Sequence, residues 1–424
     1  MALIDDAVLL MIPSGYKAGT LYNVLPNTAA GDFTVANAGT KFRTNSDLML
    51  EEIAANTPAL DYDAVGGCPH VKLNEANTNL LERPLSFDNA YWTKSGATVT
   101  GGHSSPSVTY PTDAYKLVES VDDEQHKILI AGSINVTDAT PYNLSWFVKA
   151  DGKTKVALRE SHGANKYASF NLSTGVLIES NATSESITAL SDGWYRIEMT
   201  VTSVTRYSPS LYLLPDTYTT GNPNTIATEA GDGTSGVYLA FAQLSAKSYA
   251  PTFTYSGEEG AQSSMLADAI TDGGDAALFA SVNASGVLYF EGSFNTTTPV
   301  GQYISFSDGS NDNRIQIDSY IAGFLRVRIY TDGDEAYNQN LNIGNLTNNI
   351  KIAISWEKDE FKVYINGMLK GTIITVGNTF PTNTTLNVLN FATVEGDSPF
   401  YGNTKQVAVF NYLTDAQMIE LTTP

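Results

Sequence analysis

The chain has 424 residues, more than one hydrophobic core usually holds, so we expect two or three domains. Its formal net charge of −21 argues against a nucleic acid or an anionic membrane as partner, because an acidic surface gains no counterion release from either. This charge is compatible with neutral glycans, divalent cations or a basic protein surface as partners.

Charged residues make up only 16% of the chain, which is typical of extracellular or virion proteins rich in β-structure. The single cysteine, Cys68, excludes an intramolecular disulfide and a cysteine-based zinc site. The N-terminus lacks a basic region and a cleavage site, and the apolar run 8–12 is too short to span a bilayer. We therefore expect no signal peptide and no membrane insertion, and a chain made and kept in a cytoplasm or released by lysis.

Residues 1–78 are predicted to form an irregular N-terminal segment. Glycine and proline interrupt it too often for a long helix, and a short strand is expected only at residues 33–35. Its apolar periodicity is too weak for an independent core. We therefore expect this segment to pack on its neighbours in the chain or on another subunit.

Residues 79–255 alternate apolar and polar side chains in short stretches separated by turn residues. The expected strands include residues 97–99, 114–118, 142–149, 168–172, 194–201, 210–214 and 236–244. Short strands at fairly even spacing are typical of a sandwich or jelly roll.

Residues 256–274 read as a polar linker with a small helix at 264–270, and residues 275–424 again read as strands. The clearest is a meander over 352–373, in which Asn366-Gly367 favours a type I′ hairpin turn. Near the end, Thr414 and Gln417 form a capping box before a short helix. The predicted fold is therefore all-β, with two consecutive antiparallel β-sandwiches (jelly rolls) after the irregular N-terminal segment.

Several stretches resemble known families. The stretches FDNAYWTKSGA (87–97), AYKLVE (114–119), SWFVKA (145–150), FNLSTG (170–175) and DGWYR (192–196) resemble a carbohydrate-binding-module-like jelly roll common in tailed-phage virion proteins. The preceding block 51–69 resembles the segment that often precedes this module. Trp356, FKVYING (361–367) and VAVFNYLTD (407–415) resemble a concanavalin A-like (laminin-G-like) sandwich.

The resemblance implies a virion appendage such as a fibre, spike or receptor-binding protein, often a homotrimer. Residues 1–78 would then serve attachment or oligomerisation, and the implied partners are other virion proteins, further copies of the chain and host surface polysaccharide. The implied location is the virion. The alternatives are a secreted or surface bacterial glycan-binding protein and a polysaccharide depolymerase.

The sequence does not favour an enzyme. Glycan-cutting enzymes on the concanavalin A-like fold usually carry E-x-D-x-x-E, which places their carboxylates on one face of a strand. The nearest match here begins at Glu357, lies at a predicted turn, and has Lys362 at the position of the last carboxylate. Gly152-Lys153-Thr154 ends like a phosphate-binding loop, but Phe147 occupies the position of its first glycine, so we interpret it as a turn.

Calcium is the cofactor that the sequence favours most. Two oxygen-rich loops, 308–313 and 332–335, follow predicted strands, and hard cations prefer oxygen ligands. The candidate ligands are Asp308, Asp312, Asp332 and Asp334, with an ordinary turn as the alternative interpretation.

Tyrosines near the strands of the third region are the candidates for glycan binding. Tyr320, Tyr330 and Tyr337, together with Arg326 and Arg328, lie around predicted strands and are expected to line a sheet surface. Such rings could stack on sugars or contribute to a trimer interface. Trp92, Trp146 and Trp194 are expected in the core instead.

Overall fold

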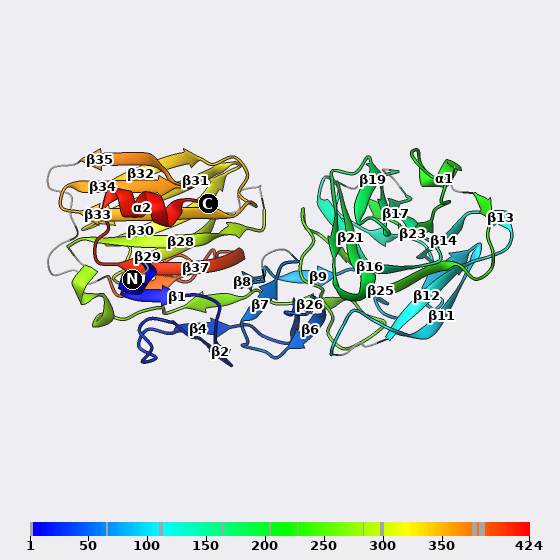
Figure 1. The fold of residues 1–424 in the computed structure, drawn as a ribbon, viewed down its shortest axis with the longest axis horizontal. Helices are drawn as coiled ribbons and strands as arrows, with labels where there is room; N and C mark the ends of the chain where they lie inside the picture. Colours follow the sequence, from blue (N-terminus) through cyan, green and yellow to red (C-terminus); the bar gives the residue numbers. More distant parts are fainter. Residues whose placement is uncertain are drawn as a thin grey trace.

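The computed structural model describes residues 3–64, 67–109, 113–162, 165–202, 205–226, 228–282, 284–296, 301–374, 380 and 386–424. It confirms the all-β prediction, because two antiparallel β-sandwich lobes account for most of the described chain (Figure 1). Among the described residues, no helix is long and apolar enough to cross a membrane.

The jelly-roll lobe consists of two six-stranded sheets. One contains, in spatial order, β10 (Trp92–Ser95), β14 (His126–Ile130), β23 (Pro209–Leu213), β17 (Lys155–Glu160), β18 (Tyr167–Asn171) and β19 (Val176–Ser180). The other contains β11 (Ala97–Ser104), β12 (Asp113–Glu119), β25 (Gly236–Ser245), β16 (Pro141–Asp151), β21 (Trp194–Thr202) and β20 (Ser184–Ala189). Trp92 and Trp146 pack between the sheets with ring centroids 5.2 Å apart, and Trp194 is also buried, as expected.

The C-terminal lobe pairs an eight-stranded sheet with a five-stranded one. The larger sheet contains β35 (Met368–Ile374), β34 (Glu360–Ile365), β33 (Ile350–Glu357), β28 (Gly286–Phe294), β37 (Gly402–Phe410), β8 (Pro69–Leu73) and β7 (Ala59–Tyr62), with β1 (Leu9–Met11) also on β37. The smaller sheet contains β32 (Asp334–Asn342), β31 (Phe324–Thr331), β30 (Arg314–Ile321), β29 (Gln302–Ser307) and β36 (Val388–Asn390).

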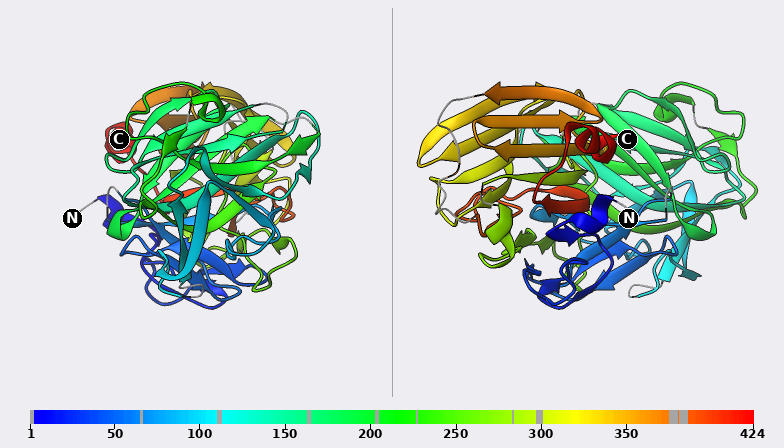
Figure 2. Two further views of the ribbon diagram at one scale, coloured as in Figure 1. Left: turned by 90° about the vertical axis from the view of Figure 1, so that its right-hand side faces the viewer. Right: turned by 60° about the vertical axis from the view of Figure 1, so that its left-hand side comes forward.

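Two local predictions in this lobe are confirmed. Asn366 and Gly367 have φ values of 49° and 78°, and Ile365 pairs with Met368 across the turn. The Thr414 side chain accepts a hydrogen bond from the Gln417 backbone, and the reciprocal bond completes a capping box before α2 (Asp415–Thr422). The right-hand view of Figure 2 shows α2 on the outer surface of this lobe, close to the N-terminal η1 (Leu3–Asp6).

The N-terminal segment adds strands to the C-terminal lobe and packs a hairpin on the jelly roll. β1, β7 and β8 extend the C-terminal sheet through β37, and Leu9 pairs with Val409. The hairpin of β5 (Lys41–Thr44) and β6 (Leu50–Ile53) packs Phe42 against Phe241 and Phe253 on the outer face of the jelly roll. This segment therefore joins the two sandwiches, and Figure 1 shows β6, β7 and β8 between them.

The remaining elements are short. They are β2 (Tyr16–Lys17), β3 (Thr20–Leu21), β4 (Phe33–Ala36), β9 (Asn77–Asn79), β13 (Asp123–Glu124), β15 (Ile134–Asn135), η2 (Ser191–Gly193), β22 (Arg206–Tyr207), α1 (Pro223–Ile226), β24 (Glu229–Ala230), β26 (Ser263–Met265), β27 (Ala269–Thr271) and η3 (Leu278–Val282). The helix predicted at 264–270 was wrong. β26 pairs with β9 and β27 pairs with β4, so long-range strand pairing outweighs the weak preference of a short segment for a helix.

Candidate functional site

The outer surface of the five-stranded sheet gathers arginine and tyrosine side chains. Along β30 and β31, the inward residues Ile315, Ile317 and Val327 enter the core, so that the residues between them face outward. We call this surface the arginine–tyrosine face and define it by Tyr303, Arg314, Asp318, Tyr320, Arg326, Arg328 and Tyr330.

Each arginine on this face lies over a tyrosine ring. The guanidinium carbon of Arg314 is 3.6 Å from the ring centroid of Tyr330, and that of Arg326 is 4.2 Å from that of Tyr320. Cation–π attraction at these distances restricts the rings. Tyr320 nevertheless keeps 53% of its surface exposed, so a held aromatic ring faces the solvent.

A buried carboxylate fixes the arginines. Arg326 Nε donates to both oxygens of Asp318 at 3.1 Å, and Arg328 Nη2 lies 3.4 Å from the same carboxylate. Burial raises the pKa of Asp318, although both guanidinium groups act in the opposite direction. Asp318 therefore orients two arginine side chains across the sheet.

Hydrogen-bonding groups surround the rings. Tyr330 donates to Glu335 Oε2 at 2.6 Å, and Asn338 donates to Glu335 Oε1 at 2.9 Å. The bond from Tyr330 lowers the pKa of Glu335, which keeps this carboxylate ionised. The face can therefore stack the apolar side of a sugar ring on Tyr320 beside the Arg326 guanidinium, and it presents these hydrogen-bonding groups at the opposite end of β30, next to Arg314.

The structure places Tyr320, Tyr330 and Arg328 on this face, with Tyr320 and Tyr330 at opposite ends of β30, but excludes Tyr337 from it. Tyr337 is 1% exposed and packs in the core against Phe361. The physical reason is that Tyr337 lies directly opposite Ile329 of β31, a core residue, and cross-strand neighbours share one face of a sheet. Sequence reasoning missed Tyr303, Arg314 and Asp318, although the alternation along 314–320 was a signal for the last two.

The two predicted calcium loops lie side by side. Gly333 N donates to the Asp312 carbonyl, and Asp332 N donates to the Asn313 side chain, each at 3.0 Å. The Asp308 carboxylate accepts hydrogen bonds from Ser310 and Asn313, which brace its own loop, and Asp334 is exposed at the start of β32. Among the described residues, no group of three or more His, Cys, Asp or Glu has metal-binding geometry, so calcium here stays a prediction.

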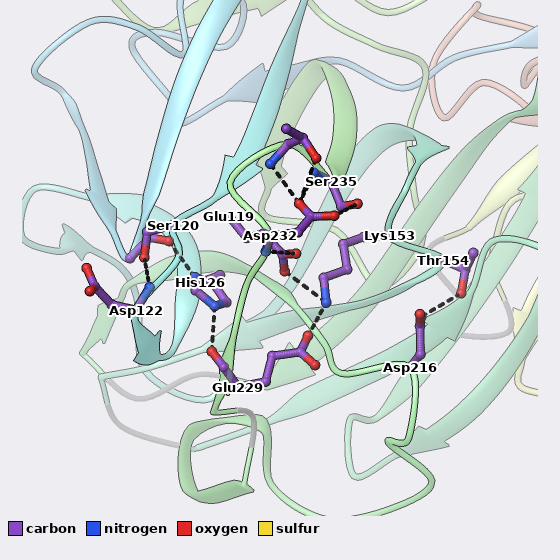
Figure 3. Close-up of polar contacts among 12 residues, drawn as sticks. Glu119, Ser120, Asp122, His126, Lys153, Thr154, Asp216, Glu229, Asp232 and Ser235 are labelled. Carbon is purple, nitrogen blue, oxygen red and sulfur yellow. Dashed lines mark hydrogen bonds and ion pairs between the residues drawn. The ribbon is translucent and has the colours of Figure 1, made fainter.

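A second polar cluster lies in the jelly roll, where Figure 3 shows Lys153 between two glutamates. Its ammonium group is 2.8 Å from Glu119 Oε2 and also pairs with Glu229, while Asp232 N donates to Glu119 Oε1 at 3.1 Å. Burial lowers the pKa of Lys153, but the two carboxylates outweigh burial and raise it. Residues 152–154 connect β16 to β17, as expected of a turn, and Lys153 is held as an internal counter-ion.

The stretch nearest to the glycosidase motif E-x-D-x-x-E contains Glu357 and Glu360, which meet at the β33–β34 turn. Glu357 pairs with Glu360 across the hairpin, and their hydrogen bond raises the pKa of Glu357. Lys362 lies 3.0 Å from Glu360 and 3.1 Å from Asp415, so these carboxylates belong to a surface ion-pair network.

No family model matches the sequence, and no curated protein matches it. Among solved structures, the chain is similar to the CBM40 of the Ruminococcus gnavus IT-sialidase bound to α2,3-sialyllactose, with 19% identity over 34% of this chain and 84% of that chain and a TM-score of 0.30. It is also similar to domain 4 of a GH43 extracellular arabinanase from Geobacillus stearothermophilus in complex with arabinotriose, with 16% identity over 40% of this chain and 81% of that one and a TM-score of 0.29. Identities and TM-scores this low do not establish a family or a ligand for this chain.

Proposed function

We propose that this chain is a non-enzymatic glycan-binding protein and that the arginine–tyrosine face contacts a surface polysaccharide. The observation that carries the proposal is Tyr320, an exposed ring that Arg326 holds in place at 4.2 Å. An aromatic ring fixed before binding loses little conformational entropy when a sugar stacks on it. The Arg326 guanidinium beside this ring can donate hydrogen bonds to the sugar hydroxyl groups.

We further propose that the chain serves as a virion appendage for host attachment, as a homotrimer bound to other virion proteins. The support for this setting is the sequence resemblance, which spans most of the chain. Deleting residues 1–78 would be a poor test, because β1, β7 and β8 belong to the C-terminal sheet. Immunogold labelling of intact particles tests the location instead, and mass measurement in solution tests the trimer.

A glycan array tests the binding function. The wild-type chain should bind a subset of polysaccharides, and Tyr320→Ala should weaken that binding about tenfold, equivalent to ~1.4 kcal/mol. The matched control is Tyr412→Ala, because Tyr412 is 60% exposed but lies before α2 on another surface. Equal effects of the two substitutions, or no binding by the wild type, would contradict the proposal. Release of reducing sugar from a bound polysaccharide would contradict its non-enzymatic part.

A further inference from the structure

A cavity of about 220 Å³ lies where the N-terminal segment meets both lobes. Its lining comes from β5 and β6, from β7 and β8 of the C-terminal sheet, from β16, β20 and β21 of the jelly roll, and from residues 250–253. This volume far exceeds what one water needs and is below the ~300–1,000 Å³ of pockets for drug-sized ligands. The cavity therefore suits a molecule of about one sugar ring.

One wall of the cavity is aromatic. Phe42, Phe147 and Phe253 line it, and the rings of Phe42 and Phe253 meet edge to face with centroids 5.4 Å apart. All three rings belong to the cluster that joins the β5–β6 hairpin to the jelly roll. They are therefore fixed by packing and present a rigid apolar surface.

The lining also includes three side chains that each have one buried polar atom without a hydrogen-bond partner among the described residues: His70 (Nδ1), Arg196 (Nε) and Glu198 (Oε2). Two of these side chains are held by another hydrogen bond, and His70 lies near a carboxylate. Arg196 Nη2 donates to the Pro251 carbonyl at 2.6 Å, Ser186 donates to Glu198 Oε1 at 2.5 Å, and the nearest acidic oxygen to His70 Nδ1 is 3.7 Å away. Buried polar groups are normally satisfied, and a hydroxylated ligand in the cavity would supply partners to these three side chains.

The charges around the cavity cancel. Burial lowers the pKa of His70, which is therefore neutral near pH 7. The remaining charged side chains of the lining are three cations and three anions: Arg43, Lys72, Arg196, Asp61, Asp63 and Glu198. An anionic ligand would meet three carboxylates and a cationic one would meet three basic groups, so the balance favours a neutral ligand.

We propose that this junction cavity binds a neutral, monosaccharide-sized polyol, with its apolar side on the phenylalanine wall and its hydroxyl groups bonded to Arg196, Glu198 and His70. A hydroxyl both donates and accepts, so one kind of group satisfies all three unpaired atoms. The ligand would bridge the C-terminal sheet and the jelly roll. This site is separate from the arginine–tyrosine face, and its occupancy does not depend on the function proposed there.

The test is saturation-transfer NMR on the full chain, with glucose, galactose, mannose and N-acetylglucosamine as neutral probes and N-acetylneuraminic acid as a charged comparator. At least one neutral sugar should bind, and the charged one should not. Glu198→Gln should weaken the neutral sugar at least tenfold, because it replaces an ionised acceptor with an amide. The matched control is Glu291→Gln, because Glu291 also accepts a hydroxyl and an amide hydrogen bond but lies in the C-terminal lobe away from the cavity.

A second variant guards against a folding defect in the first. Ala250→Leu narrows the cavity without removing any of its polar groups, and it should also weaken the sugar at least tenfold. Absence of binding by every neutral sugar at 100 mM, unchanged binding in both cavity variants, or a crystal soaked in sugar that shows only water in the cavity would each overturn the proposal.

Discussion

Replacing Lys153 by methionine tests the ion cluster of Figure 3. Methionine has a similar length and no charge, so the change removes the counter-ion and little packing. The Lys153 and Glu119 side chains are only 8% and 3% exposed, whereas that of Glu229 is 29% exposed. Glu229 can therefore turn to water, but Glu119 would stay buried and charged with one backbone donor, Asp232 N.

The magnitude follows from this burial. Breaking a buried ion pair by removing one partner typically costs ~3–5 kcal/mol. Because Glu229 can regain water, we expect the lower end of this range, about 3 kcal/mol. For a unit of 150–250 residues, each kcal/mol lowers Tm by roughly 2–4 °C, so the unfolding transition of the jelly-roll lobe should fall by about 6–12 °C.

Differential scanning calorimetry at pH 7 measures this shift. The matched control is Lys149→Met, because Lys149 pairs at 2.7 Å with Asp192, whose side chain is 76% exposed, and an exposed pair contributes at most about 1 kcal/mol. Adding Glu119→Gln to Lys153→Met should recover part of the loss, because the buried charge is then gone. A Tm for Lys153→Met within about 1 °C of the control would refute the reasoning.

Two further predictions concern the junction and the jelly roll. Burial lowers the pKa of His70 below the unfolded value of ~6.5 against the pull of Asp61 and Asp63, so the unfolded chain binds more protons and stability should fall as the pH drops from 7.5 toward 5. His70→Gln should reduce the change of the urea unfolding midpoint with pH. An unchanged pH dependence in this variant would contradict the prediction. A Cβ on Gly236 would lie 1.9 Å from the Leu117 carbonyl oxygen, so Gly236→Ala should cost at least ~1–3 kcal/mol in the same assay, and an unchanged midpoint would contradict this clash.

The strands and turns were predictable because their signals are local. Alternation of apolar and polar side chains identifies β21, and short runs rich in apolar and aromatic residues identify β16 and β28, without knowledge of their partners. The Asn366-Gly367 turn and the capping box at Thr414 depend only on backbone angles and on contacts within four residues. The same alternation was enough to expect Tyr320, Tyr330 and Arg328 on one sheet.

The position of Tyr337 shows where local reasoning ends. This ring lies opposite Ile329 of β31, whose side chain is in the core, so the partner strand decides which face of the sheet the ring occupies. In the sequence, the alternation predicts only that Asp318 faces outward. The fold shows that its carboxylate is paired with Arg326 and Arg328.

Tertiary structure alone decided how the N-terminal segment is used and where the junction cavity lies. Leu9 pairs with Val409, and the cavity joins side chains as distant in sequence as Phe42, His70, Glu198 and Asn403. The hydrophobic effect is non-directional and rewards burial by any apolar partner, so a strand's own residues do not specify which distant sheet it will extend. The sequence by itself determined two β-sandwiches and most of their strands. The packing of residues 1–78 between the two lobes determined where the junction cavity lies.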